Sequence, residues 1–376
     1  MRKFLFLILF FLILLSGLHG YAYIYSNHII NLAITTLKNR EFKIDKITKT
    51  NSIFSTNLNF DLIYKDFNLN LNILSKHSAI SIFNGIEMIG NIDDFSQKHL
   101  VKFKLNIPIN SQNINLKADI SPIKFIENHS FLELFDSYIE AKMDFEKIYL
   151  IKAKLDKAKF KLGDISSKVD GIKFDIKYTD GVSFSDLNLY SSNNLKLNIK
   201  NLNTNINFIN ITADDINLNA QTTTANLADI NTNLSAKSII INGAILKDIN
   251  SQIRLKNIDP NSYKNFDIKT NNDINQPMLI IDNLSINDIL ELKLNLLLNP
   301  ENSFKSLNLD GEIIAYKPIS SLINLEFISI YEKFLINNGI LIPFNQGYIS
   351  KFESNSQNNE LIFNNSVKFS DILEEF

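Results

Sequence analysis

Strict alternation of apolar and polar residues constrains this chain more than any other feature of its sequence. Residues 195–219 read LKLNIKNLNTNINFINITADDINLN, in which Leu or Ile mostly alternates with Asn, Lys or Asp. Successive side chains of a β-strand point to opposite faces of a sheet, so this pattern predicts strands with one apolar and one wetted face. The same period of two recurs in further runs, at residues 58–64, 67–73, 103–107, 114–120, 172–178, 184–189, 238–258, 290–298 and 306–316.

Short polar turns separate these predicted strands. Asp180-Gly181 and Asn242-Gly243 are dipeptides typical of tight turns, and strands joined by such turns pair antiparallel. We therefore predict a mainly β fold built from an elongated, curved antiparallel sheet or sheets. A sheet with a continuous apolar face must curl, close on itself or pair with something that covers that face.

Two or three short helices are predicted to interrupt the strands. Residues 26–42 carry apolar residues at helical spacing, with Ser26 or Asn27 as the N-cap. Residues 121–143 begin with Ser-Pro, and Pro suits the first turn of a helix. Residues 318–339 also begin with Pro, and they end with a Gly that suits a helix C-cap.

The N-terminus carries a basic pair, Arg2-Lys3, followed by the apolar run FLFLILFFLILL at residues 4–15. Extended to residue 25, the segment is long enough as a helix to cross a hydrocarbon core of about 30 Å. We therefore predict a signal-anchor transmembrane helix at residues 1–25. Residues 26–376 then form an exported β-rich domain, with a division near residues 258–277, a stretch rich in Pro and Asn, as an alternative.

A cleaved signal peptide is the competing interpretation of the N-terminus. Gly20-Tyr21-Ala22 has the small-x-small form of a cleavage site, but a bulky Tyr occupies its centre. The uncleaved anchor is favoured because the helical pattern continues to about residue 39. Tyr21, Tyr23 and Tyr25 would then form an aromatic belt at the far interface, and the basic pair places the N-terminus in the cytoplasm.

Residues with the chemistry of an active site are scarce in this sequence. The chain has no Cys, five scattered His and a net charge of -2, which argues against Cys-ligated metals and against nucleic acid. Asp214-Asp215 and Glu374-Glu375 are paired carboxylates, but neighbouring strand residues point to opposite faces, so we interpret both pairs as turn or surface residues. We predict no catalytic residues, no cofactor and no metal ligands. The basic run at residues 152–161 is interpreted as a solvated strand face.

Three segments resemble the bacterial YdgA-like family. Ile53-Phe54-Ser55-Thr56 is similar to the hydrophobic-Phe-Ser core of its N-terminal motif, residues 169–202 resemble its central strands, and residues 338–365 resemble its C-terminal pattern. The family is similar in layout to AsmA-like envelope proteins, whose anchored curved sheets are thought to carry or regulate lipids. The resemblance implies a single-pass protein of the bacterial inner membrane with its bulk in the periplasm.

The sequence and the resemblance together predict a non-enzymatic cell-envelope protein. Its apolar sheet face would bind lipid acyl chains, or another envelope protein, while the N-terminal helix holds it in the membrane. The alternative is a secreted structural or adhesive β protein that has lost its signal peptide.

Overall fold

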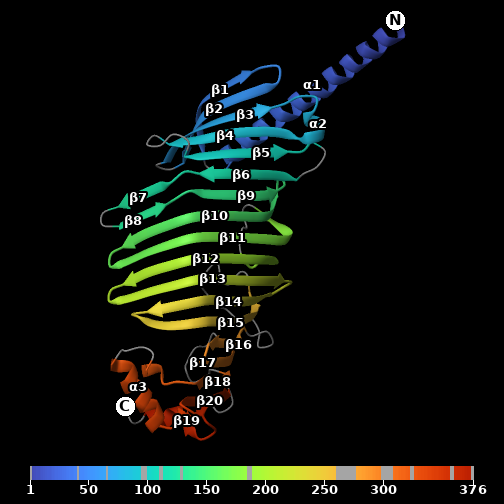
Figure 1. The fold of residues 1–376 in the computed structure, drawn as a ribbon. Helices are drawn as coiled ribbons and strands as arrows, with labels where there is room; N and C mark the ends of the chain where they lie inside the picture. The colour runs from blue at the N-terminus through green and yellow to red at the C-terminus, as the bar shows by residue number, and fades with distance from the viewer. Residues whose placement is uncertain are drawn as a thin grey trace. The chain divides into compact units, whose positions relative to one another are not determined.

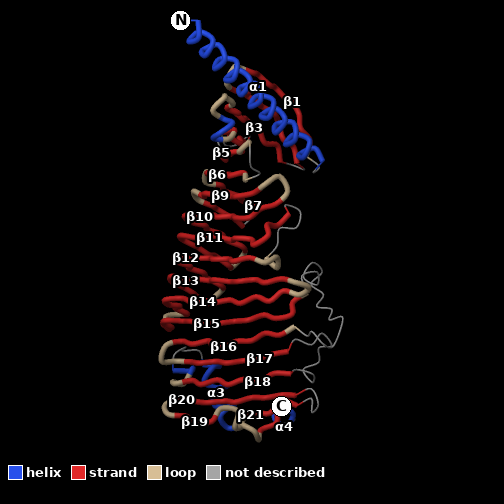
Figure 2. Tube along the Cα trace, turned by 90° about the vertical axis from the view of Figure 1, so that its right-hand side faces the viewer, coloured by secondary structure: helices blue, strands red, loops and turns tan. Residues whose placement is uncertain are grey.

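The computed structural model describes residues 2–39, 42–64, 67–94, 100–109, 113–127, 130–183, 189–259, 277–297, 308–321, 326–355 and 360–373. These residues form mainly antiparallel strands (Figures 1 and 2), so the prediction of a mainly β chain is confirmed. The chain divides into two compact units. Unit 1 comprises Met1–Phe125, Glu133–Asp156 and Gly181–Leu187, and unit 2 comprises Ile126–Leu132, Lys157–Asp180 and Asn188–Phe376.

Unit 1 combines a long helix with an antiparallel sheet. Its elements, in chain order, are α1 (Arg2–Asn39), β1 (Lys43–Asn51), β2 (Ser55–Tyr64), β3 (Phe67–Lys76), α2 (Ser81–Asn84), β4 (Ile86–Asp94), β5 (Val101–Ile107), β6 (Ile114–Ile120) and β9 (Ser137–Met143). Strands β1 to β6 pair in sequence order, and β6 then pairs with β9. Strand β9 also pairs with β10 (Lys147–Leu162), whose residues are divided between the two units. The predicted hairpin of β2 and β3 is confirmed, with Tyr64 opposite Phe67.

The core of unit 1 lies between α1 and one face of this sheet. Every second residue of β2 points to the helix, and Phe60 is only 1% exposed. Leu58 and Leu71 are buried in the same cluster, where Ile29 and Ile30 of α1 pack against them. The period of two on the strands and the helical period of α1 therefore place two apolar faces in contact. Figure 2 shows α1 running alongside the first strands.

Helix α1 runs without interruption from Arg2 to Asn39, so the predicted N-cap at Ser26 or Asn27 is wrong. Ser26 is buried in the helix, and its hydroxyl lies 2.7 Å from the hydroxyl of Ser75 on β3. Ser75 on the sheet provides the hydrogen-bond partner of the Ser26 hydroxyl, so Ser26 lies inside α1 and does not cap a helix. The predicted transmembrane span begins within residues 1–10, whose side chains lie outside the described part.

Among the helices of the described residues, none is both long enough and apolar enough to cross a bilayer.

Unit 2 is built mainly on a second run of antiparallel strands. Its elements are β11 (Ile165–Ser183), β12 (Asn193–Ile206), β13 (Ile209–Thr224), β14 (Ala228–Ile241), β15 (Ala244–Ile258), β16 (Met278–Ile286), β17 (Leu290–Leu297), β18 (Asn308–Ala315), a 3-10 turn η3 (Ile319–Ser321), α3 (Glu326–Asn337), β19 (Ile342–Phe344), β20 (Gly347–Asn355), β21 (Glu360–Phe363), β22 (Val367–Lys368) and α4 (Phe369–Leu373). The end of β11, from Gly181 onward, belongs to unit 1. Strands β11 to β18 pair in sequence order, β20 pairs with both β18 and β19, and β21 and β22 follow β20.

The alternating tract at residues 195–219 forms β12, a two-residue turn and most of β13, as predicted. Ile206 lies opposite Ile209, and the turn residues between them are Asn207 and Phe208. Asn207 has a φ of 52°, a left-handed conformation that Asn tolerates better than most residues.

The predicted helix at residues 121–143 is wrong, because this segment forms strands. It contains β7 (Ile123–Glu127), β8 (Ser130–Leu134) and β9. The backbone of β9 pairs with β6 on one side and with β10 on the other. Its own residues Ile139, Ala141 and Met143 alternate with polar ones, and this short period of two outweighs the helix-starting Pro.

The predicted turn at Asp180-Gly181 is also wrong, because β11 continues through it to Ser183. Gly181 has a φ of 70°, so the dipeptide bends the strand locally without ending it. The helix predicted at residues 318–339 is confirmed in part: α3 covers Glu326–Asn337, whereas a 3-10 turn follows Pro318, where the helix was expected to begin. Gly339 follows α3 with a φ of 68°, and its N–H donates to the carbonyl of Ile336 at 3.0 Å, as a C-cap does.

Some predictions lie outside the described residues. They concern most of the strand expected at residues 184–189 and most of the loop and division expected near residues 258–277. Leu189 itself is described, and it lies in a bend rather than a strand.

Candidate functional site

The apolar face of the unit 2 sheet is the first candidate for a functional surface. Cross-strand neighbours on this face form apolar rows that run from strand to strand. One row consists of Phe174 on β11, Leu197 on β12, Leu218 on β13 and Leu234 on β14. A second row begins with Ile176, Leu195 and Ala220. We call these two rows the apolar rows of unit 2.

Side chains of the apolar rows are mostly half-buried. Phe174, Leu197, Leu218 and Leu234 each keep part of their surface exposed, whereas Ile176 is buried. Leu195, Leu197 and Ile199 share one face of β12, as the alternation over residues 195–219 predicts, but none of the three is fully buried. Neighbouring strands lie about 4.8 Å apart, so a row across four strands gives an apolar track about 14 Å long.

One margin of this face is closed by polar contacts. Asn193 on β12 donates its side-chain amide to the carbonyl of Leu189 at 2.8 Å, and Thr222 on β13 donates its hydroxyl to the same carbonyl at 3.1 Å. Both side chains are buried. Leu189 therefore lies against this end of the two strands and limits the apolar surface there.

The opposite face of the same strands is polar throughout β12 and β13. Asn198 donates its side-chain amide to Asn217, and Lys196 lies opposite Asn219. Asn201 donates to a carboxylate oxygen of Asp214 at 2.7 Å. Such cross-strand hydrogen bonds suit a wetted face, which agrees with the sequence-based prediction.

The paired carboxylates of β13 do not form a catalytic pair. Hydrogen bonds from Asn201 and Ser238 hold the pKa of Asp214 below its ordinary value and keep it ionised. Asp215 is exposed, with a left-handed φ of 49°. General acid–base pairs need converging groups, and these two carboxylates do not converge, because Asp214 is held by Asn201 and Ser238 while Asp215 is exposed.

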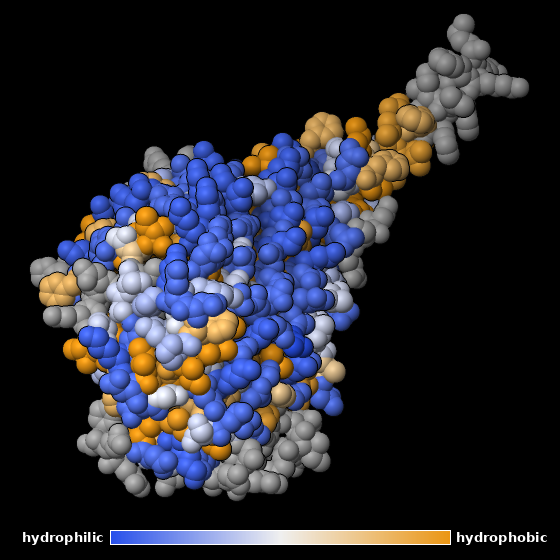
Figure 3. Space-filling view, turned by 60° about the horizontal axis from the view of Figure 1, so that its bottom comes forward, coloured by the Kyte–Doolittle hydropathy of each residue, from blue (hydrophilic) through white to orange (hydrophobic). Residues whose placement is uncertain are grey.

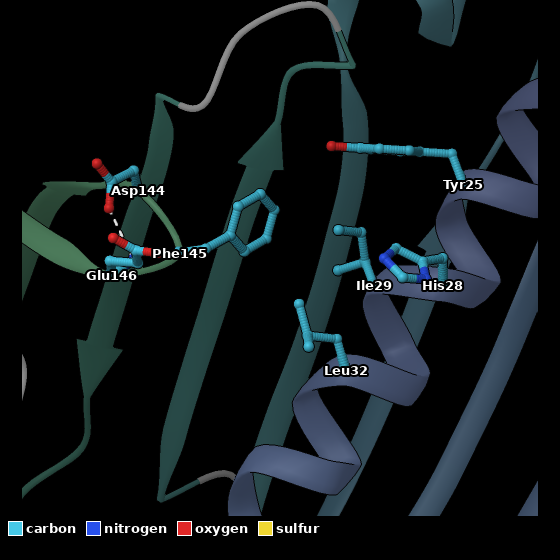
Figure 4. Close-up of a pocket in the computed structure, with 7 residues that line it drawn as sticks. All are labelled: Tyr25, His28, Ile29, Leu32, Asp144, Phe145 and Glu146. Atoms are coloured by element: carbon cyan, nitrogen blue, oxygen red, sulfur yellow. Dashed lines mark hydrogen bonds between the residues drawn. The ribbon is translucent and has the colours of Figure 1, made fainter.

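A cleft in unit 1 is the second candidate (Figure 4). It has a volume of about 390 Å³ and lies between α1 and the turn that joins β9 to β10. Its lining residues are Tyr25, His28, Ile29 and Leu32 from the helix and Asp144, Phe145 and Glu146 from the turn. Phe145 points toward the helix residues across the cleft, as Figure 4 shows.

The carboxylate of Asp144 holds that turn together through hydrogen bonds. Asp144 accepts hydrogen bonds from the backbone N–H groups of Glu146 and Lys147 at 2.7 and 2.6 Å, and from the hydroxyl of Tyr149 at 2.7 Å. Partial burial raises the pKa of Asp144, but the three hydrogen bonds outweigh it and leave that pKa below its ordinary value. The arrangement stabilises the turn and provides no activated group.

A buried polar cluster joins α1 to β2 and β3. His77 is 1% exposed, and its Nε2 lies 3.2 Å from the hydroxyl of Thr56. The ring centroid of His77 lies 5.1 Å from that of Tyr23 and 5.7 Å from that of His19. Burial, followed by the neighbouring His19, lowers the pKa of His77, so this imidazole is neutral.

The sequence shows five scattered histidines, and nothing in it predicted this cluster. His19 and His77 are 58 positions apart on different elements, and no local spacing could have paired them. Over the described residues, no group of three or more His, Cys, Asp or Glu side chains is arranged to hold a metal ion. We therefore interpret the cluster as packing between the helix and the sheet.

Other residues discussed from the sequence are placed as follows. Residues 152–161 lie in β10 as predicted, where Lys154 pairs with Asp156 at 2.8 Å. His99, His129 and the pair Glu374-Glu375 lie outside the described residues.

Compared with models of protein families, with curated proteins and with solved structures, this chain matches none. The resemblance to the YdgA-like family therefore stays a prediction, and the surfaces above carry the functional argument.

Proposed function

We propose that this chain is a membrane-anchored envelope protein of the YdgA- and AsmA-like type that holds lipid acyl chains on the apolar rows of unit 2. The proposal is carried by the continuity and the partial burial of those rows. Phe174, Leu197, Leu218 and Leu234 form one continuous line, and each side chain is half-buried. Acyl chains are apolar and flexible, and they need a continuous dry surface rather than specific polar groups.

Energetics favour an occupant for such a surface. Apolar surface removed from water contributes about 25 cal/mol per Å², so a chain laid along half-buried Leu and Phe side chains gains favourable free energy at each contact. Exposed apolar patches on soluble proteins are generally small, and larger ones mark binding surfaces. The polar face behind the rows keeps the same strands in contact with water.

The N-terminal segment supports the membrane part of the proposal. Residues 4–15 are all apolar, they follow Arg2-Lys3, and α1 includes all of them. A basic pair before an apolar helix favours a cytoplasmic N-terminus, which puts both units on the far side of the membrane. In this arrangement the protein takes its lipid from the inner membrane of a bacterium and works in the periplasm without an enzymatic step.

Lipid retention by the purified chain tests the proposal. The full chain, extracted in mild detergent and purified, is analysed for bound phospholipid by mass spectrometry. We expect the double variant Ile216→Asp, Leu218→Asp to lose most of the bound lipid. The matched control Asn217→Asp, Asn219→Asp places the same two charges on the polar face of β13 and should retain it.

Circular dichroism and denaturant unfolding of each variant separate lipid loss from unfolding. A well-folded wild-type chain without lipid would overturn the acyl-chain proposal. The apolar rows would then be a docking surface for an envelope protein, or part of a secreted structural β protein whose N-terminal segment is removed. An intact Met1 in the mature, membrane-bound protein excludes that last alternative.

A further inference from the structure

Two loops of unit 1 expose large apolar side chains beside α1. The turn between β1 and β2 exposes Ile53 (73%) and Phe54 (65%). The short segment around α2 exposes Ile80 (65%) and Phe83 (78%). We call these four residues the collar, because both loops lie next to the same stretch of α1.

Contacts fix the position of both loops against the helix. The ring of Phe54 lies edge-on to the ring of His19 on α1, with centroids 5.4 Å apart. Helix α2 is in contact with α1, as Figure 1 shows. The backbone N–H of His77 also donates to the carbonyl of Phe54 at 3.0 Å, which ties the first loop to the segment that leads into α2.

Hydrogen bonds within each loop fix its backbone, so the exposed side chains are held in defined positions. In the first loop, the backbone N–H of Ser52 donates to the carbonyl of Ser55 at 2.8 Å, and the two hydroxyls lie 2.7 Å apart. In the second loop, the backbone N–H of Ser78 donates to the hydroxyl of Ser81 at 3.0 Å. Exposing four large apolar residues on ordered loops is unfavourable in water, which indicates that another phase covers them.

The composition of the loops indicates what that phase is. Residues 51–56 and 77–85 contain no Asp, Glu, Lys or Arg in a chain that is 21% charged. Ser and Asn supply their polar groups instead, and small neutral polar groups next to Ile and Phe suit the boundary between headgroups and acyl chains.

The helix beside the collar continues directly into an apolar segment. Residues 11–17 of α1 are exposed and mostly apolar, whereas Ala22 is completely buried against unit 1. Figure 3 shows these apolar side chains in orange along the part of α1 that projects from the strands. Tyr23 and Tyr25 pack toward the strands, so Tyr21 is the one tyrosine of the expected aromatic belt that stays exposed.

Helix length then explains why a collar is needed. The packing of α1 onto the sheet begins near residue 19, which leaves residues 4–18 for the bilayer. Fifteen helical residues span about 22 Å, which is less than a hydrocarbon core of about 30 Å. A span this short requires the bilayer to thin or the surface around the helix to sink toward it.

We infer that unit 1 rests on the membrane that holds α1, with Ile53, Phe54, Ile80 and Phe83 inserted into the boundary between its headgroups and acyl chains. This inference rests on the membrane anchor of the proposed function and adds a second point of contact to it. The occupant of this surface is a phospholipid bilayer, and the surface is continuous with the apolar segment of α1.

Tryptophan fluorescence tests the inference directly, because the wild-type chain contains no Trp. Four full-length single-Trp variants are reconstituted into vesicles of phosphatidylcholine and phosphatidylglycerol, with and without phosphatidylcholine brominated on its acyl chains. Phe54→Trp and Phe83→Trp report on the collar, and Phe11→Trp reports on the anchor. Phe145→Trp is the matched control, because it is another exposed turn Phe of unit 1 that lies against α1, beside Ile29.

The position of each Trp along helix α1 determines the depth in the membrane that we expect for it. Ile29 follows His19 by ten positions, so Phe145 lies about 15 Å further along the helix than Phe54. We expect brominated lipid to quench Trp at positions 11, 54 and 83 severalfold more strongly than Trp at position 145. Trp emission at positions 54 and 83 should also lie at shorter wavelength in the reconstituted vesicles than before reconstitution.

The outcomes separate the inference from the anchor. Strong quenching at position 11, with positions 54 and 83 quenched no more than position 145, would overturn the collar and leave the anchor standing. Absence of quenching at position 11 as well would overturn the anchor and the inference with it. Circular dichroism of each variant confirms that the strands are intact before quenching is compared.

Discussion

The two units use the same alternating sequence pattern and differ in what covers the apolar face. In unit 1, α1 lies on the sheet and buries Leu58, Phe60 and Leu71 in one cluster with Ile29 and Ile30. In unit 2, the equivalent positions Phe174, Leu197 and Leu218 are half-buried. Alternation in a sequence therefore shows that a strand has an apolar face, but it does not show what covers that face.

This difference has a functional consequence. A face filled by the protein's own helix serves stability, because every apolar contact is made within the chain. A face whose side chains stay partly exposed has surface available to another molecule. The covered face of unit 1 therefore serves stability, and the apolar rows of unit 2 are where the proposed function places binding.

A buried charge should give the largest difference between the units. Leu58→Asp places a carboxylate in the cluster under α1, and we expect a loss of more than about 3 kcal/mol in the free energy of unfolding. Leu197→Asp leaves its carboxylate in reach of water, so we expect about 1 to 2 kcal/mol. Hydrogen exchange of peptides from each unit measures both effects. Equal losses would mean that the two faces are covered to the same degree.

Truncation of an aromatic side chain should show the same order between the two units. Phe60→Ala leaves a cavity between α1 and the sheet and should cost about 3 to 5 kcal/mol. Phe174→Ala removes a side chain that already contacts water and should cost roughly half as much or less. Urea unfolding of the two variants against wild type gives the comparison, and a larger loss for Phe174→Ala would contradict it.

Acid should weaken unit 1 more than unit 2. Burial and the neighbouring His19 lower the pKa of His77 from its ordinary value of 6.5. The unfolded chain therefore binds more protons than the folded chain once the pH falls below about 6.5, and stability present at neutral pH is lost toward the lower folded-state pKa. No described residue of unit 2 is a histidine.

Hydrogen exchange between pH 7.5 and pH 5 checks this expectation. The protection factors of amides in α1, β2 and β3, which are corrected for the intrinsic effect of pH, should fall at the lower pH, and those of amides in β12 to β14 should not. In His77→Gln, the difference between the units should shrink. An unchanged difference in that variant would show that another group is responsible.

A polar pair on unit 2 should give the smallest effect. Arg254 on β15 and Asp282 on β16 form a bidentate ion pair whose side chains are 38% and 35% exposed. Solvent screens such a pair, so a double-mutant cycle of Arg254→Ala and Asp282→Ala should give a coupling energy close to zero, as exposed ion pairs do. The coupling should fall further in high salt. A coupling of several kcal/mol would mean that this surface is less wetted than its exposure indicates.

The local pattern was sufficient to predict most strands. The hairpins of β2 with β3 and of β12 with β13 follow from period-two alternation across a short gap, and Gly339 ends α3 as its sequence indicates. Short segments with mixed signals were harder. At residues 121–143, backbone pairing with neighbouring strands decided for β structure, and such pairing is not visible in a local window.

The candidate surfaces depend on contacts between distant residues, which the sequence could not provide. His19 approaches His77, and Phe54 approaches the same turn of α1, because the helix lies across β2 and β3. The collar has a signal that sequence analysis could have used: two charge-free loops, each with exposed Ile and Phe, in a chain with frequent charges. The half-buried state of the apolar rows has no such signal, because buried and half-buried strands alternate alike.

Site-resolved crosslinking to lipid tests the assignment of the two faces most directly. The full chain is reconstituted with phospholipid that carries a photoreactive diazirine at the end of one acyl chain, irradiated, digested and mapped by mass spectrometry. We predict adducts on β12, β13 and β14 at or beside Leu197, Leu218 and Leu234, and none at Leu58, Phe60 or Leu71. Adducts absent from the apolar rows of unit 2 while α1 is labelled would contradict the account.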